Sequence, residues 1–138
     1  MAHSALKGLY FLHKRNIVHR DIKSDNVLYN YKGEVKLADF GFATALTTEE
    51  KTQKDAMGTL LYMAPELCKE ENYDCKVDIW SFGIMMVELA NQMRPYDDMV
   101  PFPDSPEKIL ALHEKGVPRV NDKKAWSETF LDFIDRCL

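Results

Sequence analysis

The sequence predicts a mainly α-helical fold with one small β-hairpin. Residues 2–15 carry apolar side chains at helical spacing, and residues 77–90 are apolar on nearly all sides. Two β-prone runs flank the turn at Tyr31-Lys32-Gly33, which indicates a hairpin. With 138 residues, 46% of them hydrophobic and 29% charged, the chain is long enough for one domain with its own core.

The first predicted helix covers residues 2–15, whose apolar side chains recur on one face: Ala2, Ala5, Leu6, Leu9 and Leu12. No capping residue precedes this helix, so we expect the chain to begin inside a larger unit. Asn16 suits the left-handed backbone that ends many helices. Ile17-Val18 is then predicted to form a short strand.

The run from His19 to Asn26 places two cations, two carboxylates, an imidazole and an amide in the octet His-Arg-Asp-Ile-Lys-Ser-Asp-Asn. Burying so many polar groups without partners costs free energy, so the run is either a solvated loop or a functional site. β-Prone residues on both sides hold its ends, and catalytic groups are often carried by loops that are held in this way. This context favours a site.

Residues 27–30 and 34–38 form the predicted hairpin. Because an antiparallel hairpin brings its ends together, we expect Asn26, before the first strand, to lie close to Asp39, after the second. An amide oxygen and a carboxylate are ligands that a hard cation such as Mg²⁺ prefers. The pattern therefore predicts a magnesium site where the hairpin ends meet.

The middle of the chain contains the most apolar predicted helix. Residues 42–57 show no sustained period and predict a mobile loop, whereas residues 63–67 predict a short helical turn. Residues 77–90 are typical of a central, buried helix. We expect the replacement of Trp80 by alanine to be the most damaging core change, at about 3–5 kcal/mol.

Two helices are predicted near the end of the printed sequence. Ser105-Pro106 is typical of a cap followed by proline at the first helical position, and the helix then runs to about Lys115 and ends at Gly116. Residues 126–138 carry apolar side chains at helical spacing: Phe130, Phe133, Ile134 and Cys137.

Composition and charge argue against several classes of protein. The net charge of −4 gives no reason to expect nucleic acid or an anionic membrane as a partner. No stretch approaches the roughly 18 consecutive apolar residues of a membrane helix, and the first residues lack the pattern of a signal peptide. Cys68, Cys75 and Cys137 lack C-x-x-C spacing, so we expect reduced thiols and a cytoplasmic protein.

Four motifs occur in order along the chain: His19-Arg20-Asp21-x-Lys23-x-x-Asn26, Asp39-Phe40-Gly41, Ala64-Pro65-Glu66 and Asp78-Ile79-Trp80-Ser81-Phe82-Gly83. Each tripeptide alone is a weak signal. The ordered set, with the last motif at the start of an apolar helix, resembles the signature of the protein kinases. The competing interpretation is a helical domain with unrelated polar loops.

Finer features resemble the serine/threonine kinases. Lys23 lies two residues after the aspartate of the octet, and Gly58-Thr59 precedes Ala-Pro-Glu. The octet and Lys76-Val77-Asp78-Ile79-Trp80-Ser81 resemble the PAK-like, or sterile-twenty-like, branch. The resemblance implies that residues 1–138 are a partial kinase domain. They would form the mostly helical C-terminal lobe, without the Gly-rich lid, strand lysine and hinge of the N-terminal lobe.

The resemblance implies phosphoryl transfer from ATP, with Mg²⁺, to serine or threonine hydroxyls of protein substrates. Asp21 would accept or orient the hydroxyl proton. Lys23 would neutralise charge on the transferred phosphoryl group, and Thr59 would bridge these two residues. Asn26 and Asp39 would hold Mg²⁺, which agrees with the convergence expected from the hairpin.

The resemblance also implies supporting roles. Leu28 would form an apolar floor beneath the adenine, unless it is a plain core leucine. Phe40 would pack against His19, which makes this histidine structural, and Gly41 would let the loop swing. Asp78 would accept hydrogen bonds from the backbone of the catalytic loop, unless it only faces the dipole of its helix.

The sequence departs from the family at several positions. Where PAK-like kinases are phosphorylated to switch on, this chain has Asp55, which would offer Arg20 a permanent negative charge unless it is a solvated loop aspartate. Leu60-Leu61-Tyr62-Met63 replaces Pro-Tyr-Trp-Met, which leaves the substrate preference open. Glu66 would lack its arginine partner, expected beyond the printed sequence. Other candidate phosphorylation sites are Thr47, Thr48 and Thr52.

Two functions compete. The first is the catalytic lobe of a serine/threonine kinase, with little activity expected from these 138 residues alone, because nothing in them closes over the triphosphate. The second is a non-catalytic module that docks substrates or regulators. The joint presence of Asp21, Lys23, Asn26 and Asp39 favours the first. A small GTPase, a frequent partner of PAK-like kinases, would bind through regions outside this chain.

Overall fold

The computed structural model describes residues 1–46, 55–97 and 102–138 of the chain. Its helices are α1 (Ala2–His13), α2 (Pro65–Cys68), α3 (Lys76–Asn91), α4 (Pro106–Lys115) and α5 (Glu128–Cys137), with 3-10 turns at Ser24–Asn26, Leu60–Tyr62 and Lys123–Ala125. The predicted mainly α-helical fold with a small hairpin is confirmed. In these three ranges no helix has the length and apolar character needed to cross a membrane.

The strands of the described residues form two antiparallel pairs: β1 (Ile17–Val18) with β4 (Thr44–Ala45), and β2 (Val27–Tyr29) with β3 (Val35–Leu37). In the hairpin β2–β3, Val27 pairs with Leu37. The prediction that residues 42–57 lack regular structure is wrong at β4, which pairs with β1. A two-residue strand has no period that sequence reasoning could detect.

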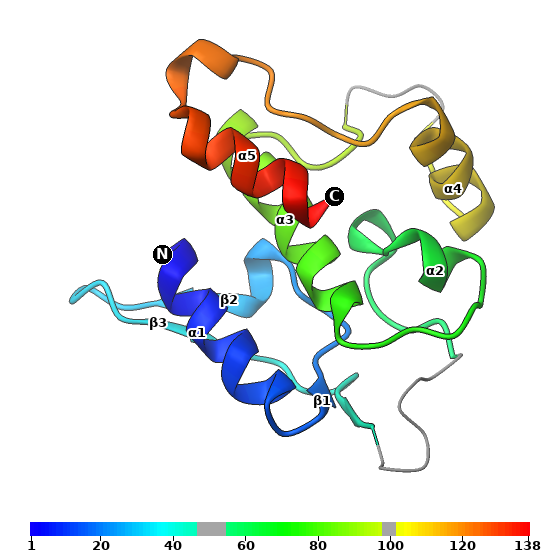
Figure 1. Cartoon of the computed structure of the whole chain (residues 1–138), viewed down its shortest axis with the longest axis horizontal. Helices are drawn as coiled ribbons and strands as arrows, with labels where there is room; N and C mark the ends of the chain where they lie inside the picture. Colours follow the sequence, from blue (N-terminus) through cyan, green and yellow to red (C-terminus); the bar gives the residue numbers. More distant parts are fainter. Residues whose placement is uncertain (47–54, 98–101) are drawn as a thin grey trace.

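Helix α3 runs through the middle of the molecule, with α1 and the hairpin on one side and α4 and α5 on the other (Figure 1). Phe82 of α3 is fully buried, and its ring meets that of Phe133 edge-on, with the centroids 6.0 Å apart. Trp80 is only partly buried, and its indole N–H has no hydrogen-bond partner among the described residues. The helix is central, as predicted. Because the cost of truncation depends on buried volume, however, we expect Phe82→Ala to cost more than Trp80→Ala.

Polar side chains and a left-handed residue set the ends of several helices. Ser105 accepts a hydrogen bond from the Lys108 N–H at 3.4 Å at the start of α4, as its sequence predicts. Ser127 caps α5 through the Phe130 N–H at 3.2 Å, a cap that sequence reasoning missed. Asn16 has the left-handed backbone expected after α1, with φ of 56°.

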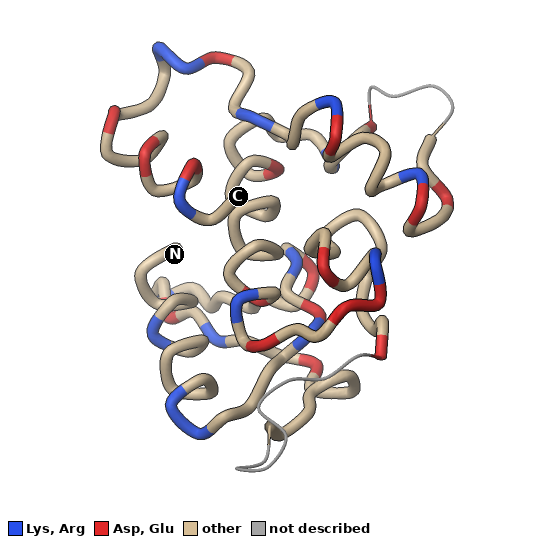
Figure 2. The backbone as a smooth tube through the Cα atoms, turned by 45° about the vertical axis from the view of Figure 1, so that its right-hand side comes forward, with Lys and Arg blue, Asp and Glu red and all other residues tan. Residues whose placement is uncertain are grey.

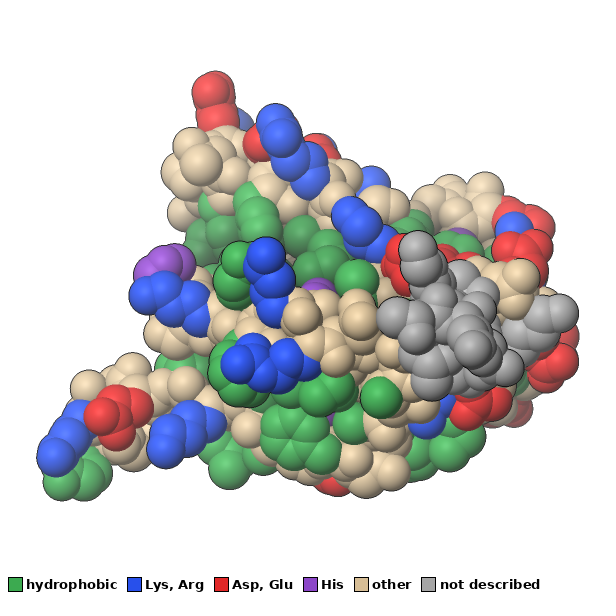
Figure 3. All heavy atoms as spheres, turned by 60° about the horizontal axis from the view of Figure 1, so that its bottom comes forward, with side chains coloured by type: hydrophobic (Ala, Val, Ile, Leu, Met, Phe, Trp, Pro, Cys, Tyr) green, Lys and Arg blue, Asp and Glu red, His purple; other side chains and the backbone are tan. Residues whose placement is uncertain are grey.

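The surface is mixed in charge but has an apolar region. Acidic and basic residues are interspersed along the described chain (Figure 2), in keeping with the small net charge. Figure 3 views the end of the molecule that carries α1 and the hairpin, where hydrophobic side chains lie exposed among lysine and arginine residues. The large exposed hydrophobic residues of these elements include Tyr10, Phe11, Leu28 and Tyr29.

His113 connects α4 to α3 through buried contacts. Its Nε2 lies 2.8 Å from the Tyr96 hydroxyl, and its ring centroid lies 5.0 Å from that of Trp80. Burial lowers the pKa of His113 from 6.5 to about 4. The unfolded chain therefore binds this proton more readily than the folded chain. The contribution of His113 to stability should be fully present above pH 6.5 and should be lost as the pH decreases toward 4.

We therefore expect the free energy of unfolding in urea to be lower at about pH 5 than at about pH 7. His113→Gln should weaken this pH dependence, because its side chain does not titrate. His3→Gln, at the exposed start of α1, is the control and should keep the dependence of the unmodified chain. An identical pH profile for His113→Gln and the unmodified chain would exclude His113 as the responsible group.

Candidate active site

The polar run His19–Asn26 is anchored by Asp78 in the first turn of α3. Asp78 is fully buried; its Oδ2 accepts from the His19 N–H at 2.9 Å and its Oδ1 from the Arg20 N–H at 2.8 Å. These bonds hold Arg20 in the left-handed region, at φ of 66°, which costs free energy for a residue with a side chain. The expected contact of Asp78 with the loop backbone is present, so Asp78 does more than face the helix dipole.

His13 is a further partner of Asp78. Its Nε2 lies 2.8 Å from Asp78 Oδ2, so the last turn of α1 is tied to the first turn of α3 behind the loop. Sequence reasoning missed this histidine. The residues lie 65 positions apart, and nothing in the periodicity of the first helix singles out His13.

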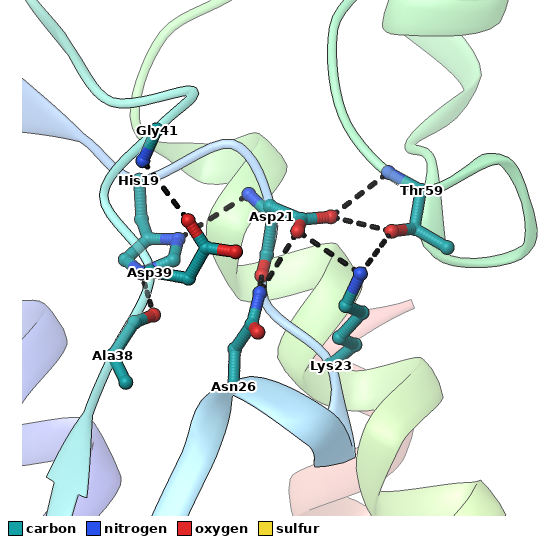
Figure 4. A network of polar contacts seen from close by, with 8 residues as sticks. All are labelled: His19, Asp21, Lys23, Asn26, Ala38, Asp39, Gly41 and Thr59. Atoms are coloured by element: carbon teal, nitrogen blue, oxygen red, sulfur yellow. Dashed lines mark hydrogen bonds and ion pairs between the residues drawn. The ribbon is translucent and has the colours of Figure 1, made fainter.

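Asp21 lies at the centre of a hydrogen-bonded network (Figure 4). Its Oδ1 accepts from the Thr59 N–H at 2.9 Å and from the Thr59 hydroxyl at 2.6 Å. Its Oδ2 accepts from Asn26 Nδ2 at 2.8 Å and forms an ion pair with Lys23 Nζ at 3.1 Å. Lys23 also donates to Thr59 Oγ1 at 2.8 Å, so the expected bridge between Asp21 and Lys23 is present.

These donors set the charge of Asp21. Burial alone would raise the pKa of this carboxyl, but the hydrogen bonds from Thr59, Lys23 and Asn26 and the charge of Lys23 outweigh it. The pKa of Asp21 therefore lies below its usual 3.8. Asp21 is ionised at neutral pH and is held rigidly, which suits a group that accepts a hydrogen bond from a hydroxyl and orients it.

Asn26 and Asp39 lie at the joined ends of the hairpin. The Ala38 N–H donates to the Asn26 carbonyl at 2.9 Å. Asp39 is the next residue after Ala38, so this bond brings it near Asn26. Asn26 Nδ2 donates to Asp21 at 2.8 Å, which leaves the amide oxygen to act as a ligand. Asp39 is exposed, and its Oδ1 accepts from the Gly41 N–H at 3.2 Å.

This pair fits a cation that takes its other ligands from water or substrate. Carboxylate and amide oxygens suit a hard cation such as Mg²⁺, which usually keeps several waters and one or two protein carboxylates. Within the described residues, no three His, Cys, Asp or Glu side chains gather around a metal position. The amide oxygen of Asn26 and the carboxylate of Asp39 therefore form a donor set of the kind that Mg²⁺ prefers.

His19 is a structural residue by its contacts. It is fully buried, its ring centroid lies 5.0 Å from that of Phe40, and its Nε2 lies 3.1 Å from the Ala38 carbonyl oxygen. Its Nδ1 accepts from the Asp21 N–H at 3.3 Å. Both ring nitrogens are engaged with the backbone, and the expected packing of Phe40 on His19 is present.

Arg20 contacts Asp55, as the sequence suggested, and also a residue that was missed. Its Nη1 donates to Asp55 Oδ2 at 2.6 Å and to the Tyr73 hydroxyl at 2.9 Å, and its Nε donates to the Phe42 carbonyl at 2.6 Å. Burial alone would raise the pKa of Asp55, but the hydrogen bonds from Arg20 and Tyr73 lower it below 3.8. The other candidate phosphorylation sites, Thr47, Thr48 and Thr52, lie outside the described residues.

Glu88 of α3 was also missed. The Ser24 hydroxyl donates to its Oε1 at 3.1 Å, so α3 contacts the loop His19–Asn26 a second time, well away from Asp78. Burial raises the pKa of Glu88, and hydrogen bonds from Tyr62 and Ser24 only partly offset this effect. No motif includes Glu88, and 64 positions separate it from Ser24.

Comparisons with known proteins agree with the geometry. A family profile described as protein kinase domain matches residues 1–138. The chain belongs to the protein kinase family. It is 45% identical to serine/threonine-protein kinase pakB and 44% identical to pakC, both of Dictyostelium discoideum, over 133 residues each, or 96% of this chain. It is 40% identical over 133 residues to serine/threonine-protein kinase STE20 of Candida glabrata. The chain spans 15%, 27% and 14% of the lengths of these relatives, respectively.

Three further positions were singled out by the kinase resemblance: Leu28, Glu66 and the segment Leu60–Tyr62. Leu28 on β2 is 56% exposed, so it is not a plain core leucine. Glu66 is half-buried in the first turn of α2, and no basic side chain of the described residues forms an ion pair with it. The unusual Leu60–Tyr62 segment forms a 3-10 turn directly after Thr59. It therefore begins next to Thr59, which is bonded to Asp21.

Proposed function

We propose that residues 1–138 supply the C-terminal lobe of a serine/threonine protein kinase of the PAK-like branch, which transfers the γ-phosphate of ATP to protein hydroxyls. The observation that carries this proposal is the Asp21 carboxylate, ionised and held by Lys23, Asn26 and Thr59 next to the end of the hairpin. Phosphoryl transfer depends mostly on positioning and on neutralising charge, and this arrangement provides both.

Each residue then has a chemical task. Asp21 accepts the hydrogen bond of the attacking serine or threonine hydroxyl and receives its proton. Lys23, paired with Asp21 at 3.1 Å, places its ammonium where charge develops on the transferred group. The oxygens of Asn26 and Asp39 would hold Mg²⁺, and Mg²⁺ and ATP, when bound, supply charge neutralisation and the phosphoryl group. Leu28 would lie beneath the adenine.

Thr59 and Asp55 connect the activation segment to this chemistry. Thr59 donates to Asp21 and accepts from Lys23, which supports the proposed preference for hydroxyl substrates of the serine/threonine type. Asp55 pairs with Arg20 at 2.6 Å, at the position where the family carries its activating phosphate. We propose that the Asp55 carboxylate replaces part of the charge of that phosphate.

The alternative function is a kinase lobe that docks substrates or regulators without catalysis. The exposed hydrophobic side chains of α1 and the hairpin (Figure 3) fit either docking or contact with an N-terminal lobe. Protein substrates are common to both functions. A small GTPase bound through other regions and a cytoplasmic location stay predictions; the free thiols of Cys68, Cys75 and Cys137 agree with the latter.

The two functions are separated by placing this chain in an active framework. Residues 1–138 would replace the matching segment of pakB, and Mg²⁺-dependent transfer from ATP to serine and threonine peptides would be measured. We expect activity, and a loss of at least about 100-fold with Asp21→Asn. Asp25→Asn, an exposed carboxylate of the same loop, should stay near the unmodified chimera. A folded chimera that binds ATP but transfers no more phosphate than Asp21→Asn would favour the docking module.

A further inference from the structure

Tyr73, which lies in the loop between α2 and α3, contacts both members of the Arg20–Asp55 ion pair. Its hydroxyl accepts from Arg20 Nη1 at 2.9 Å and donates to Asp55 Oδ1 at 3.0 Å. The Arg20 side chain is 9% exposed and that of Asp55 is 54% exposed, whereas Tyr73 is 2% exposed as a residue. Tyr73 is thus the member of the group that is anchored in the core.

The ion pair alone is a weak way to hold a segment. A pair with one half-exposed partner typically contributes only about 0–1 kcal/mol, because water screens it and the side chains lose freedom. A buried hydroxyl that already points at both partners removes much of that loss of freedom and adds hydrogen bonds to charged groups. Tyr73 belongs to the buried cluster that also contains Leu67 and Val77, so its position is fixed by packing.

Residues 55–59 connect this ion pair to the candidate active site. Asp55 is held by Arg20 and Tyr73, and four residues later Thr59 donates to Asp21. Between them, Gly58 packs directly on the main chain of Arg20. If Asp55 is held less firmly, we therefore expect the hydrogen bonds between Thr59 and Asp21 to weaken as well.

We propose that Tyr73 is a positioning residue, which fixes Asp55 on Arg20 and so keeps Thr59 on Asp21 without a phosphate on the activation segment. This inference rests on the proposed kinase function, because it names a residue through which the activation segment is held. The charges agree with it: burial raises the pKa of Tyr73, which stays neutral as a donor, while Asp55 stays ionised with its pKa below 3.8.

The test uses the 138-residue chain and the variant Tyr73→Phe, which removes only the hydroxyl. We expect two changes in NMR experiments. The pKa of the Asp55 carboxyl should rise toward 3.8, since one of its donors is lost. Amide exchange at Thr59 should become at least about tenfold faster, which is the lower end of the effect expected for losing one hydrogen bond to a charged group. Tyr29→Phe, at an exposed tyrosine, is the matched control and should change neither.

Two further measurements separate positioning from packing. Exchange of the α3 amides should stay unchanged in Tyr73→Phe, whereas a merely structural role would accelerate these amides together with Thr59. Adding Tyr73→Phe to Asp55→Asn should accelerate exchange at Thr59 little further, because both changes break the same link.

Either of two results would overturn the proposal: an unchanged Asp55 pKa and Thr59 exchange in Tyr73→Phe, or equal acceleration at Thr59 and throughout α3. These measurements need neither ATP nor phosphate transfer. A failure here is therefore distinct from a failure of the pakB chimera.

Discussion

Replacing Asp78 by alanine is expected to lower the free energy of unfolding by on the order of 3–5 kcal/mol. The carboxylate is fully buried, accepts the main-chain N–H groups of His19 and Arg20, and lies 2.8 Å from His13 Nε2. Alanine would leave these groups without an acceptor in the interior, at about 1–3 kcal/mol each. Because these bonds hold Arg20 in its left-handed backbone, the loop His19–Asn26 should lose its shape as well.

Urea unfolding, followed by circular dichroism, would measure the loss. Amide exchange at His19 and Arg20 would show whether the loop opens before the rest of the chain. Asp25→Ala, at an exposed carboxylate of the same loop, should stay within about 0.5 kcal/mol of the unmodified chain. Asp78→Asn keeps one acceptor oxygen and should fall in between. Equal stability of Asp78→Ala and Asp25→Ala would mean that something other than this carboxylate anchors the loop.

Most of the elements could be predicted because their causes lie within a few residues. The cap at Ser105-Pro106 and the apolar character of residues 77–90 act locally, so the sequence alone reveals them. The approach of Asn26 to Asp39 follows from the same kind of pattern, since an antiparallel hairpin fixes where its ends meet. The burial of single residues within a helix is harder to predict. In a helix that is apolar on all sides, such as α3, the sequence does not tell which side chains stay partly exposed, as Trp80 does.

The contacts that join distant elements could not be predicted from local pattern. His13 and Asp78 are 65 positions apart, and Tyr73 and Asp55 are 18 apart. No period links such positions, and their meeting depends on how whole helices and loops pack on α3. The family resemblance supplied Thr59 and Asp78, whose partners are equally distant, because they stand in recognisable motifs. It supplied neither His13 nor Tyr73, which belong to none of those motifs.

Gly58 is the position where a single added carbon should do the most damage to the active site. Its φ of +117° is unfavourable for any other residue, and a Cβ would lie 2.1 Å from the carbonyl oxygen of Arg20. That oxygen belongs to main chain that Asp78 holds in place, so it has little room to yield. The main chain around Gly58 and Thr59 is joined to the loop His19–Asn26 through the side chains of Asp21 and Lys23, so it should move instead.

In Gly58→Ala we therefore expect Thr59 to leave Asp21, which would break the bonds from the Thr59 N–H and hydroxyl and from Lys23 to Thr59. Exchange at the Thr59 amide should accelerate by at least about 100-fold, the equivalent of roughly 2.7 kcal/mol. The pKa of Asp21 should rise, because Thr59 is its strongest hydrogen-bond donor. The stability that depends on its ionised form would then be lost at a higher pH as the solution is acidified.

Gly116→Ala is the control that isolates the clash from the backbone strain. Gly116 has a comparable φ of +136°, but a Cβ added there would have no heavy atom of the described residues within 4 Å, apart from its own chain neighbours. Alanine at this position meets only the unfavourable backbone conformation, so it should destabilise the end of α4 without any effect on Thr59 or Asp21. If Gly58→Ala disturbed Thr59 no more than Gly116→Ala does, the two main chains would have moved apart at small cost. The close contact between Gly58 and the main chain of Arg20 would then not be needed to hold Thr59 on Asp21.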